Sequence, residues 1–311
     1  MKPWRWVLGA LAVVTVVLAV QFAVRFPWSG TLTAVARADW LLLAAAAVAN
    51  IVSLVAKAWA WHLVLLRRAR NRWRTAQAAT FVAAAVNSVS VSVSGEAARL
   101  HVATSRDGVP VNAGLWSLVW CRIIEAVGLV VFLAVVLAVI PTEPWMRPIE
   151  IGAWVVLCLL AATWAFGVGP RLVSLMPAAW QARIVGWSSP PTRWLAPLVL
   201  SIVNWAAQWL TFHLAFVATH VSTTANVSLS ALVMANLGGI FRITPGNVGV
   251  LQASLVLGML AFNIAEDQAL AAGLTLQAIQ VVPILAIGVA LVGAQGLRSL
   301  GAKRAQAAEA A

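Results

Sequence analysis

Six ionisable side chains lie within apolar segments of the chain, and charged groups in such surroundings are candidates for ligand binding. Four are basic and two are acidic: Lys57, Glu96, Arg99, Arg122, Glu125 and Arg242. An ionised side chain that faces lipid at the bilayer centre costs about 2.5–3.5 kcal/mol, so we expect these groups to face an interior cavity. Two acids cannot neutralise four bases, and an anionic head group such as a lipid phosphate would balance the remaining charge.

Mutual pairing is the alternative role for each of these charges. Arg122 and Glu125 are three residues apart, which places both on one face of a helix, and Arg99 follows Glu96 at the same spacing. Lys57 lies about 15 Å deep by the rise of an α-helix, and its long side chain can extend toward the interface. On this interpretation the individual charges are structural, and only the excess of positive charge indicates a ligand.

Two polar, glycine-containing runs interrupt otherwise apolar segments. The first, Asn87–Glu96, lies within Ala76–Thr104, and the second, Thr244–Gly249, lies within Ser228–Phe262. Non-helical backbone at membrane depth is tolerated only where protein or a water-filled cavity covers it. Each segment is therefore either one kinked span or a re-entrant hairpin of two half-helices.

In the hairpin interpretation, the second half-helix of each hairpin starts at the break. Ser94 is the expected N-cap of the first, and Thr244 caps the second with Pro245 at the first helical position. The free backbone N–H groups and positive dipole ends of these helices suit an anion. The alternative is that Gly and Ser only permit close helix packing. The candidate ligand-binding residues at the breaks are Ser94, Gly95, Thr244, Pro245, Gly246 and Asn247.

The composition is that of a membrane protein. Of 311 residues, 62% are hydrophobic and 10% are charged, and the mean hydropathy is +0.91. Soluble domains carry about 25% charged residues, so a water-soluble fold is excluded. Six segments approach the roughly 20 apolar residues that a span needs: Val7–Val24, Trp40–Leu66, Ala113–Ile140, Ile151–Val168, Leu195–Val221 and Ala269–Gly296. No Ala-x-Ala site follows the first, so we interpret it as a retained helix.

The net charge of +12 reflects membrane topology and not nucleic-acid binding. The basic residues cluster in short loops such as Arg67–Arg74, which is the positive-inside pattern. If both broken segments are hairpins, fourteen of the 21 Lys and Arg residues are cytoplasmic, three lie outside and four lie within the membrane. If only the first crossed fully, the loop Arg171–Arg193 and the C-terminus would move outside. If both segments crossed fully, only the loop Arg171–Arg193 would lie outside, which the positive-inside rule disfavours. The charge distribution therefore favours two hairpins.

The predicted fold is all-α: a polytopic membrane bundle of about six full spans plus two re-entrant broken-helix hairpins in pseudo-inverted repeats. Residues 1–311 form one integral membrane domain: 1–39 the first helix and outside loop, 40–168 the first half with hairpin 76–105, 169–297 the second half with hairpin 228–263, and 298–311 a cytoplasmic tail. We expect a bacterial inner-membrane protein with both termini in the cytoplasm. Broken segments in opposite orientations indicate a site at the midplane.

The sequence lacks the motifs of common enzymes, and we expect neither a metal nor a cofactor. It contains no His-Glu-x-x-His, Gly-x-Ser-x-Gly, P-loop or dinucleotide fingerprint. Its two cysteines, Cys121 and Cys158, both lie in apolar runs, which excludes a disulfide framework. A membrane glycosyltransferase stays open as an alternative, because it could use an acid of the outside loops with a metal: Asp39, Glu143, Glu150, Glu266 or Asp267.

Three stretches resemble the lysylphosphatidylglycerol synthase transmembrane family, the flippase-like domain of multiple-peptide-resistance factors, which also occurs as stand-alone bacterial membrane proteins. They are Ser94–Arg99 (SGEAAR), Arg122–Glu125 (RIIE) and Thr244–Gln252 (TPGNVGVLQ). The resemblance runs from about Trp40 to Gly296. It implies that the protein flips a phospholipid between leaflets.

The chain matches one family motif and departs from the other. The first is usually Gly-Gly-Glu with an Arg three residues later, and Glu96 and Arg99 match it. The second is usually Pro-Gly-Gly-x-Gly followed by an acid, but Asn247 replaces the middle glycine and Gln252 the acid. The arginine usual in the last helix is replaced by Gln277. The two neutral amides, Gln252 and Gln277, allow two interpretations. They hydrogen-bond each other in place of an ion pair, or they make the protein prefer an unmodified anionic lipid over an aminoacylated one.

The expected function is translocation of an anionic lipid, either a phospholipid or a polyprenyl-phosphate carrier. The chain ends fifteen residues after Gly296, so we expect no aminoacyl-transferase domain and no synthesis of aminoacylated lipid. The alternative is a membrane glycosyltransferase or its dedicated subunit in envelope synthesis. A third possibility is a structural partner of an envelope-synthesis enzyme.

The charge distribution makes the topology testable. Cysteines introduced near Arg72, Arg183 and Lys303 should be labelled from the cytoplasm, and those near Glu143 and Asn226 from outside, because Lys and Arg are retained inside. A membrane-impermeant thiol reagent applied to intact cells and to inverted vesicles measures this. Labelling near Arg183 from outside would exclude the double-hairpin topology.

Overall fold

The computed structural model describes residues 36–90, 94–140, 143–166, 171, 174–175, 192–240 and 244–309. Throughout these residues the chain forms helices joined by turns, with no strand. The predicted all-α class is therefore confirmed for the described part of the chain.

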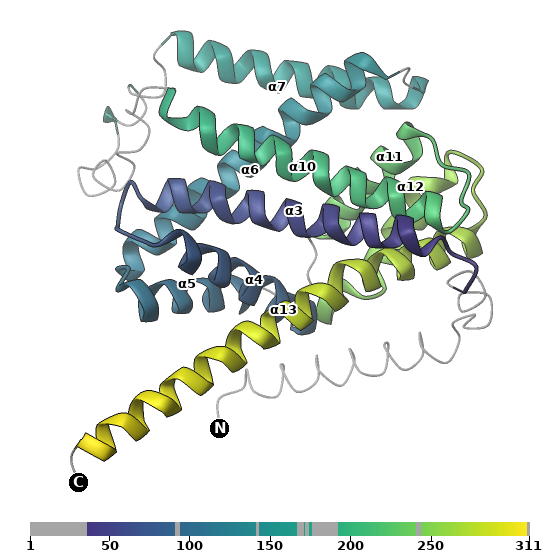
Figure 1. The fold of residues 1–311 in the computed structure, drawn as a ribbon. Coiled ribbons are helices and arrows are strands. Elements are labelled where there is room, and N and C mark those ends of the chain that lie inside the picture. The colour runs from purple at the N-terminus through teal and green to yellow at the C-terminus, as the bar shows by residue number, and fades with distance from the viewer. Residues whose placement is uncertain are drawn as a thin grey trace, which may run out of the picture. The chain divides into compact units, whose positions relative to one another are not determined.

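Five of the described helices are long and apolar enough to cross a bilayer (Figure 1). They are α3 (Trp40–Leu65), α6 (Val111–Val139), α7 (Arg147–Ala165), α10 (Thr192–Ala218) and α13 (Glu266–Glu309). They correspond to five of the six predicted spans, and the sixth, Val7–Val24, lies outside the described residues. The short 3-10 helix η1 (Pro144–Met146) leads into α7. Helix α13 continues through most of the predicted cytoplasmic tail, whose Ala, Gln, Lys and Glu residues favour helix.

Local sequence sets where these helices begin. The carboxylate of Asp39 accepts hydrogen bonds from the backbone N–H groups of Leu41 (2.9 Å) and Leu42 (3.2 Å), which are otherwise unsatisfied at the start of α3. Helix α6 starts directly after Pro110, whose ring fixes φ at −59° and lacks an N–H that would need a partner. Asp39 thus has a structural role as a helix cap.

The helices form two compact units, each assembled from segments far apart in the sequence. The first unit takes its described residues from Met1–Val48, Ala84–Gly95 and Thr211–Ala286. The second takes them from Ala49–Ala83, Glu96–Leu210 and Ile287–Ala311. Neither unit is a continuous stretch of chain.

The second broken segment, in the first unit, is a hairpin of two antiparallel helices, α11 (Ala225–Gly238) and α12 (Val250–Leu260), drawn in green in Figure 1. Ser230 Oγ donates to the carbonyl of Gly258 at 2.8 Å, and Gly238 at the other end of α11 lies against Ser254. Gly258 packs directly on Ala231, where only a glycine permits so close an approach. The chain therefore turns back on itself at this break.

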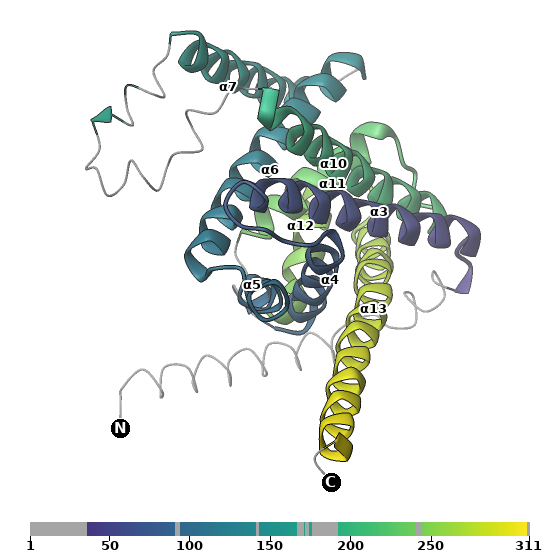
Figure 2. The same ribbon diagram turned by 60° about the vertical axis from the view of Figure 1, so that its left-hand side comes forward.

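The first broken segment is also a hairpin, formed by α4 (Trp73–Val89) and α5 (Ser94–Asp107), which lie side by side in Figures 1 and 2. At its closed end the Asn87 side chain accepts from the backbone N–H of Gly95 at 3.1 Å. At its open end the Asp107 carboxylate accepts from the Arg72 N–H (2.6 Å) and from the Thr75 hydroxyl (2.9 Å). One acid thus joins the end of α5 to the start of α4.

The two breaks meet inside the first unit. The backbone N–H of Gly246, in the 3-10 turn η3 (Pro245–Asn247), donates to the carbonyl of Ser90 at 3.5 Å. Gly246 has φ +60°, and a Cβ added there would lie 2.5 Å from the carbonyl oxygen of Ser88. Both the left-handed backbone and the close approach of the other hairpin therefore require glycine at this position.

We predict that Gly246→Ala destabilises the protein by about 1–3 kcal/mol, because it adds backbone strain and a steric clash. Thermal unfolding in detergent, followed by tryptophan fluorescence, measures the loss. Gly108→Ala is the control for strain alone, since its φ is +64° and nothing lies within 4 Å of the added Cβ. Equal losses in the two variants would show that the two breaks do not pack closely.

Candidate functional site

Four charged side chains form a continuous chain of ion pairs in the second unit. Lys57 Nζ lies 3.2 Å from both oxygens of the Glu125 carboxylate, and Arg122 Nη1 lies 3.0 Å from Oε2 of the same group. Arg122 Nη2 also pairs with Glu96 Oε1. This ion-pair chain, Lys57–Glu125–Arg122–Glu96, contains two cations and two anions and is neutral as a whole.

Three helices position the ion-pair chain. Lys57 comes from α3, Glu96 from α5, and Arg122 and Glu125 from α6. The predicted pairing of Arg122 with Glu125 at i,i+3 spacing is confirmed. The indole N–H of Trp205 on α10 donates to the backbone carbonyl of Glu125 at 2.8 Å. Glu125 is nearly buried, with 10% of its side chain exposed, whereas 47% of the Arg122 side chain is exposed.

Arg99 lies beside these groups but outside the ion-pair chain. It is 4% exposed, and its Cζ atom lies 4.1 Å from the centre of the Trp61 ring. Trp61 is fully buried and is fixed by a hydrogen bond from its indole N–H to Ser117 Oγ at 2.9 Å. The Arg99 Nε and Nη2 atoms are buried and have no hydrogen-bond partner in the described structure. A guanidinium stacked on a ring keeps its N–H edge available for an anion.

Two expectations about local pairing are wrong. Glu96 pairs with Arg122 and not with Arg99, because the Arg99 side chain stacks on Trp61. Lys57 does not extend to the interface, because Glu125 binds its ammonium. Pairing accounts for four of the five described charges, so three cations face two acids and Arg99 carries the excess. The sixth predicted residue, Arg242, lies outside the described residues.

The first break is capped by a residue other than the predicted one. Asn87 accepts from the Gly95 N–H at the start of α5, whereas the Ser94 hydroxyl contacts the hydroxyl of Ser90. Asn87 belongs to the polar run at the break, eight residues before Gly95. Only the hairpin brings it back to the helix terminus, so its cap cannot be derived from local spacing.

The second break also differs from the prediction. Helix α12 begins at Val250, so neither Thr244 nor Pro245 starts it. Thr244 Oγ1 donates to the carbonyl of Val248 at 2.8 Å, and Pro245 opens the 3-10 turn η3. The reason is backbone conformation: Gly246, Asn247 and Gly249 have φ values of +60°, +59° and +83°, which no α-helix contains.

A relay of side-chain amides closes the second break. Gln252 Oε1 accepts from the Gly249 N–H at 2.7 Å, and Gln252 Nε2 donates to Gln277 Oε1 at 2.5 Å. Gln277 Nε2 then donates to the carbonyl of Gly246 at 3.0 Å. The predicted approach of Gln252 and Gln277 is confirmed. Gln252 is 1% exposed, and both of its amide atoms are already bonded within the protein.

Trp61 was not among the predicted site residues, although it positions Arg99. It lies four residues after Lys57 on α3, the spacing that places two side chains on one helix face. That spacing could have identified it, but the sequence contains 17 tryptophans. Only the fold distinguishes this buried ring from those at the interfaces.

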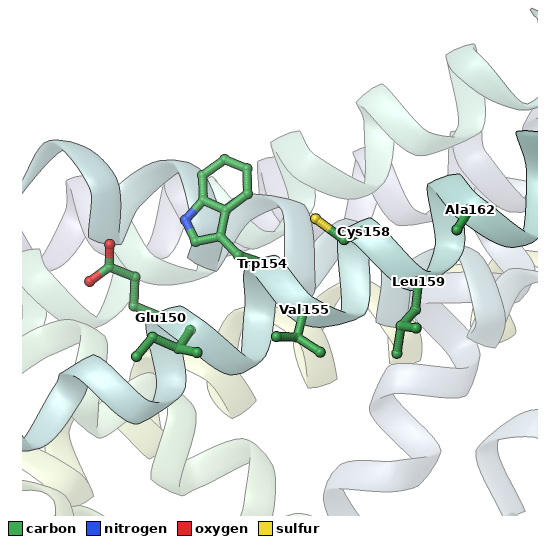
Figure 3. Close-up of a pocket in the computed structure, with 7 residues that line it drawn as sticks. Glu150, Trp154, Val155, Cys158, Leu159 and Ala162 are labelled. Carbon is green, nitrogen blue, oxygen red and sulfur yellow. The ribbon is translucent and has the colours of Figure 1, made fainter.

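A shallow apolar groove of about 470 Å³ runs along α7 in the second unit, and Figure 3 shows its side chains projecting from this single helix. Its lining residues are Glu150, Ile151, Trp154, Val155, Cys158, Leu159 and Ala162. Ligand sites usually bring polar groups from several elements together, which this groove does not. The groove has the apolar character of a surface that contacts lipid chains.

Comparison with known proteins identifies the family. No curated protein matches the chain. The family model described as the lysylphosphatidylglycerol synthase TM region matches residues 7–288, a range that includes the ion-pair chain, Arg99 and the amide relay. This match confirms the family that the motifs indicated, and with the five candidate spans it supports a multi-pass membrane protein with a membrane-lipid-related function. The chain belongs to the lysylphosphatidylglycerol synthase transmembrane-region family.

Proposed function

We propose that this protein translocates an anionic lipid, either a phospholipid or a polyprenyl-phosphate carrier, across the bacterial inner membrane. The observation that carries the proposal is Arg99, a buried guanidinium whose Nε and Nη2 atoms have no hydrogen-bond partner in the described structure. A buried guanidinium with unsatisfied N–H groups is costly, and a lipid phosphate would supply acceptor oxygens together with a negative charge. Family membership supports a lipid as the ligand.

The surroundings of Arg99 suit an anion that binds and leaves. The neutral ion-pair chain leaves one net positive charge among the five described groups, which matches a monoanionic phosphodiester. Arg122, which binds Glu96 at the end of that chain, is 47% exposed, so a phosphate could replace Glu96 as its partner. Such binding would be reversible, because Lys57 and Arg122 keep internal acidic partners when the anion leaves.

The helical hairpins support re-entrant segments in a pseudo-inverted arrangement. Each broken segment turns back on itself. A re-entrant segment must do so, because it leaves the bilayer on the side from which it entered. With the predicted charge distribution, the first would enter from the cytoplasm and the second from outside. Transporters built in this way bind their substrate near the bilayer midplane, where we propose that the lipid head group binds.

No specific observation favours the glycosyltransferase alternative. Asp39, one of the acids it could use, caps α3 through the backbone N–H groups of Leu41 and Leu42. An enzyme of that class would depend on acids of the outside loops, whereas translocation would depend on charges within the membrane. Substitutions at these two groups of residues therefore distinguish the two functions.

We predict that Arg99→Gln lowers the rate of lipid movement by about 10- to 100-fold, since charge-assisted hydrogen bonds contribute roughly 1.5–3 kcal/mol. The protein should not become less stable, because the substitution removes a buried uncompensated charge. A leaflet-specific assay with fluorescent phosphatidylglycerol in reconstituted vesicles measures the rate, and thermal unfolding measures stability. Arg106→Gln, on the same helix, is the matched control. Wild-type transport by Arg99→Gln would limit Arg99 to a packing role.

A second prediction concerns the amide relay. Gln252→Glu should lower stability by about 1–3 kcal/mol, because a carboxylate cannot donate to Gln277 Oε1 in this buried position. Adding Gln277→Arg should restore stability by supplying a donor. Neither protein should change its preference between lysylated and unmodified phosphatidylglycerol, because residue 252 is not accessible to a head group. A shift toward the lysylated lipid in the transport assay would show that this position faces the substrate.

A further inference from the structure

Where α3 ends and α10 begins, in the second unit, one arginine stacks on an indole ring and a second arginine directly precedes that ring in the sequence. Arg67 Cζ lies 3.8 Å from the centre of the Trp194 ring, and Arg193 directly precedes Trp194. Both arginines are exposed at their outer ends. Partial burial and then the nearby charge of Arg193 lower the pKa of Arg67, so the two guanidinium groups are close enough to repel each other.

Neither arginine has an acidic partner among the residues that the structure describes. The ion pairs found there all belong to the ion-pair chain. Asp107, the acid that contacts the loop after α3, accepts instead from the Arg72 N–H and from the Thr75 hydroxyl. An anion placed against both arginines would replace their repulsion with attraction.

The ring beneath Arg67 is rigidly supported. The centres of the Trp194 and Trp120 rings are 5.3 Å apart, and Trp194 packs against the buried cluster of Val64, Trp120 and Ile124. Stacking on this ring uses the face of the Arg67 guanidinium, and its N–H edge has no acidic partner among the described residues. That edge is a planar fork whose geometry matches two oxygens of a phosphate.

The position of this arginine pair indicates the source of the phosphate. The apolar span of α3 ends at Leu65 and that of α10 starts at Arg193, so the pair lies at a membrane–water boundary, where lipid phosphates are concentrated. Lys57, in the ion-pair chain, lies about 12 Å before the end of α3 by helical rise. The pair is therefore separate from the charges around Arg99.

We propose that Arg67 and Arg193, supported by the Trp194 ring, form a binding site for the phosphate of an anionic phospholipid in the adjacent leaflet. The site holds a lipid at the protein surface. It does not depend on whether the protein translocates lipid through the charges around Arg99.

The test compares charge-conserving variants of the full chain purified in detergent. Phosphatidylglycerol, phosphatidylcholine and inorganic phosphate are each titrated, and bound lipid is counted by native mass spectrometry. Arg67→Lys and Arg193→Lys should each weaken phosphatidylglycerol binding by about fivefold, because a lysine keeps the charge but has no planar fork. Arg70→Lys, in the same loop, is the matched control and should bind normally. Phosphatidylcholine should bind more weakly than phosphatidylglycerol to the wild type.

Two results would overturn the proposal. Equal binding by Arg67→Lys and Arg70→Lys would show that the loop attracts anions only through its net charge. Competition by inorganic phosphate at the concentrations at which phosphatidylglycerol binds would assign the site to free anions. The vesicle transport assay separates this site from the proposed function: weakened phosphatidylglycerol binding by Arg67→Lys together with no lipid movement by the wild type would contradict translocation and leave the surface site standing.

Discussion

The double ion pair of Glu125 is the interaction on which the second unit depends. Glu125 binds both Lys57 and Arg122, and Arg122 extends the contact to Glu96, so the ion-pair chain joins α3, α6 and α5. Charges inside a low-dielectric bundle require such partners, because breaking a buried pair leaves an uncompensated charge. Both acids of the cluster are used in this way. Arg99 stacks on an aromatic ring instead and forms no ion pair with the acids that the structure describes.

Among the described residues of the first unit, the helix break meets the same requirement without charged side chains. Its helix break exposes backbone groups that neither α11 nor α12 can satisfy, and the amide relay bonds two of them. The Gly249 N–H donates to Gln252 Oε1, and the Gly246 carbonyl accepts from Gln277 Nε2. A third group, the Gly246 N–H, reaches Ser90 in the other break. Backbone that leaves the helix at membrane depth is stable only when its polar groups are bonded internally.

Features set by composition and short-range spacing could be predicted from the sequence. The five described spans, the two breaks and the Arg122–Glu125 pair follow from hydropathy and helical period. Partners distant in sequence could not be predicted: Arg122 and Glu96 are 26 residues apart, and Asn87 reaches Gly95 only because the chain turns back. The start of α12 was misplaced because a Thr-Pro pair indicates a helix N-terminus, whereas the following residues adopt left-handed backbone.

The second break and the charged cluster differ in whether their polar groups have hydrogen-bond partners, and this difference indicates where a ligand binds. In the amide relay every donor has an acceptor inside the protein, so a head group that bound there would first have to displace strong internal hydrogen bonds. Beside the ion-pair chain, Arg99 has donor atoms without an acceptor among the described residues, so binding an anion there would break none of the hydrogen bonds found in that part of the chain. A ligand gains most affinity where the protein leaves a buried group unsatisfied. The relay therefore fixes the fold around the breaks, and the charged cluster is the better candidate for recognising a lipid phosphate.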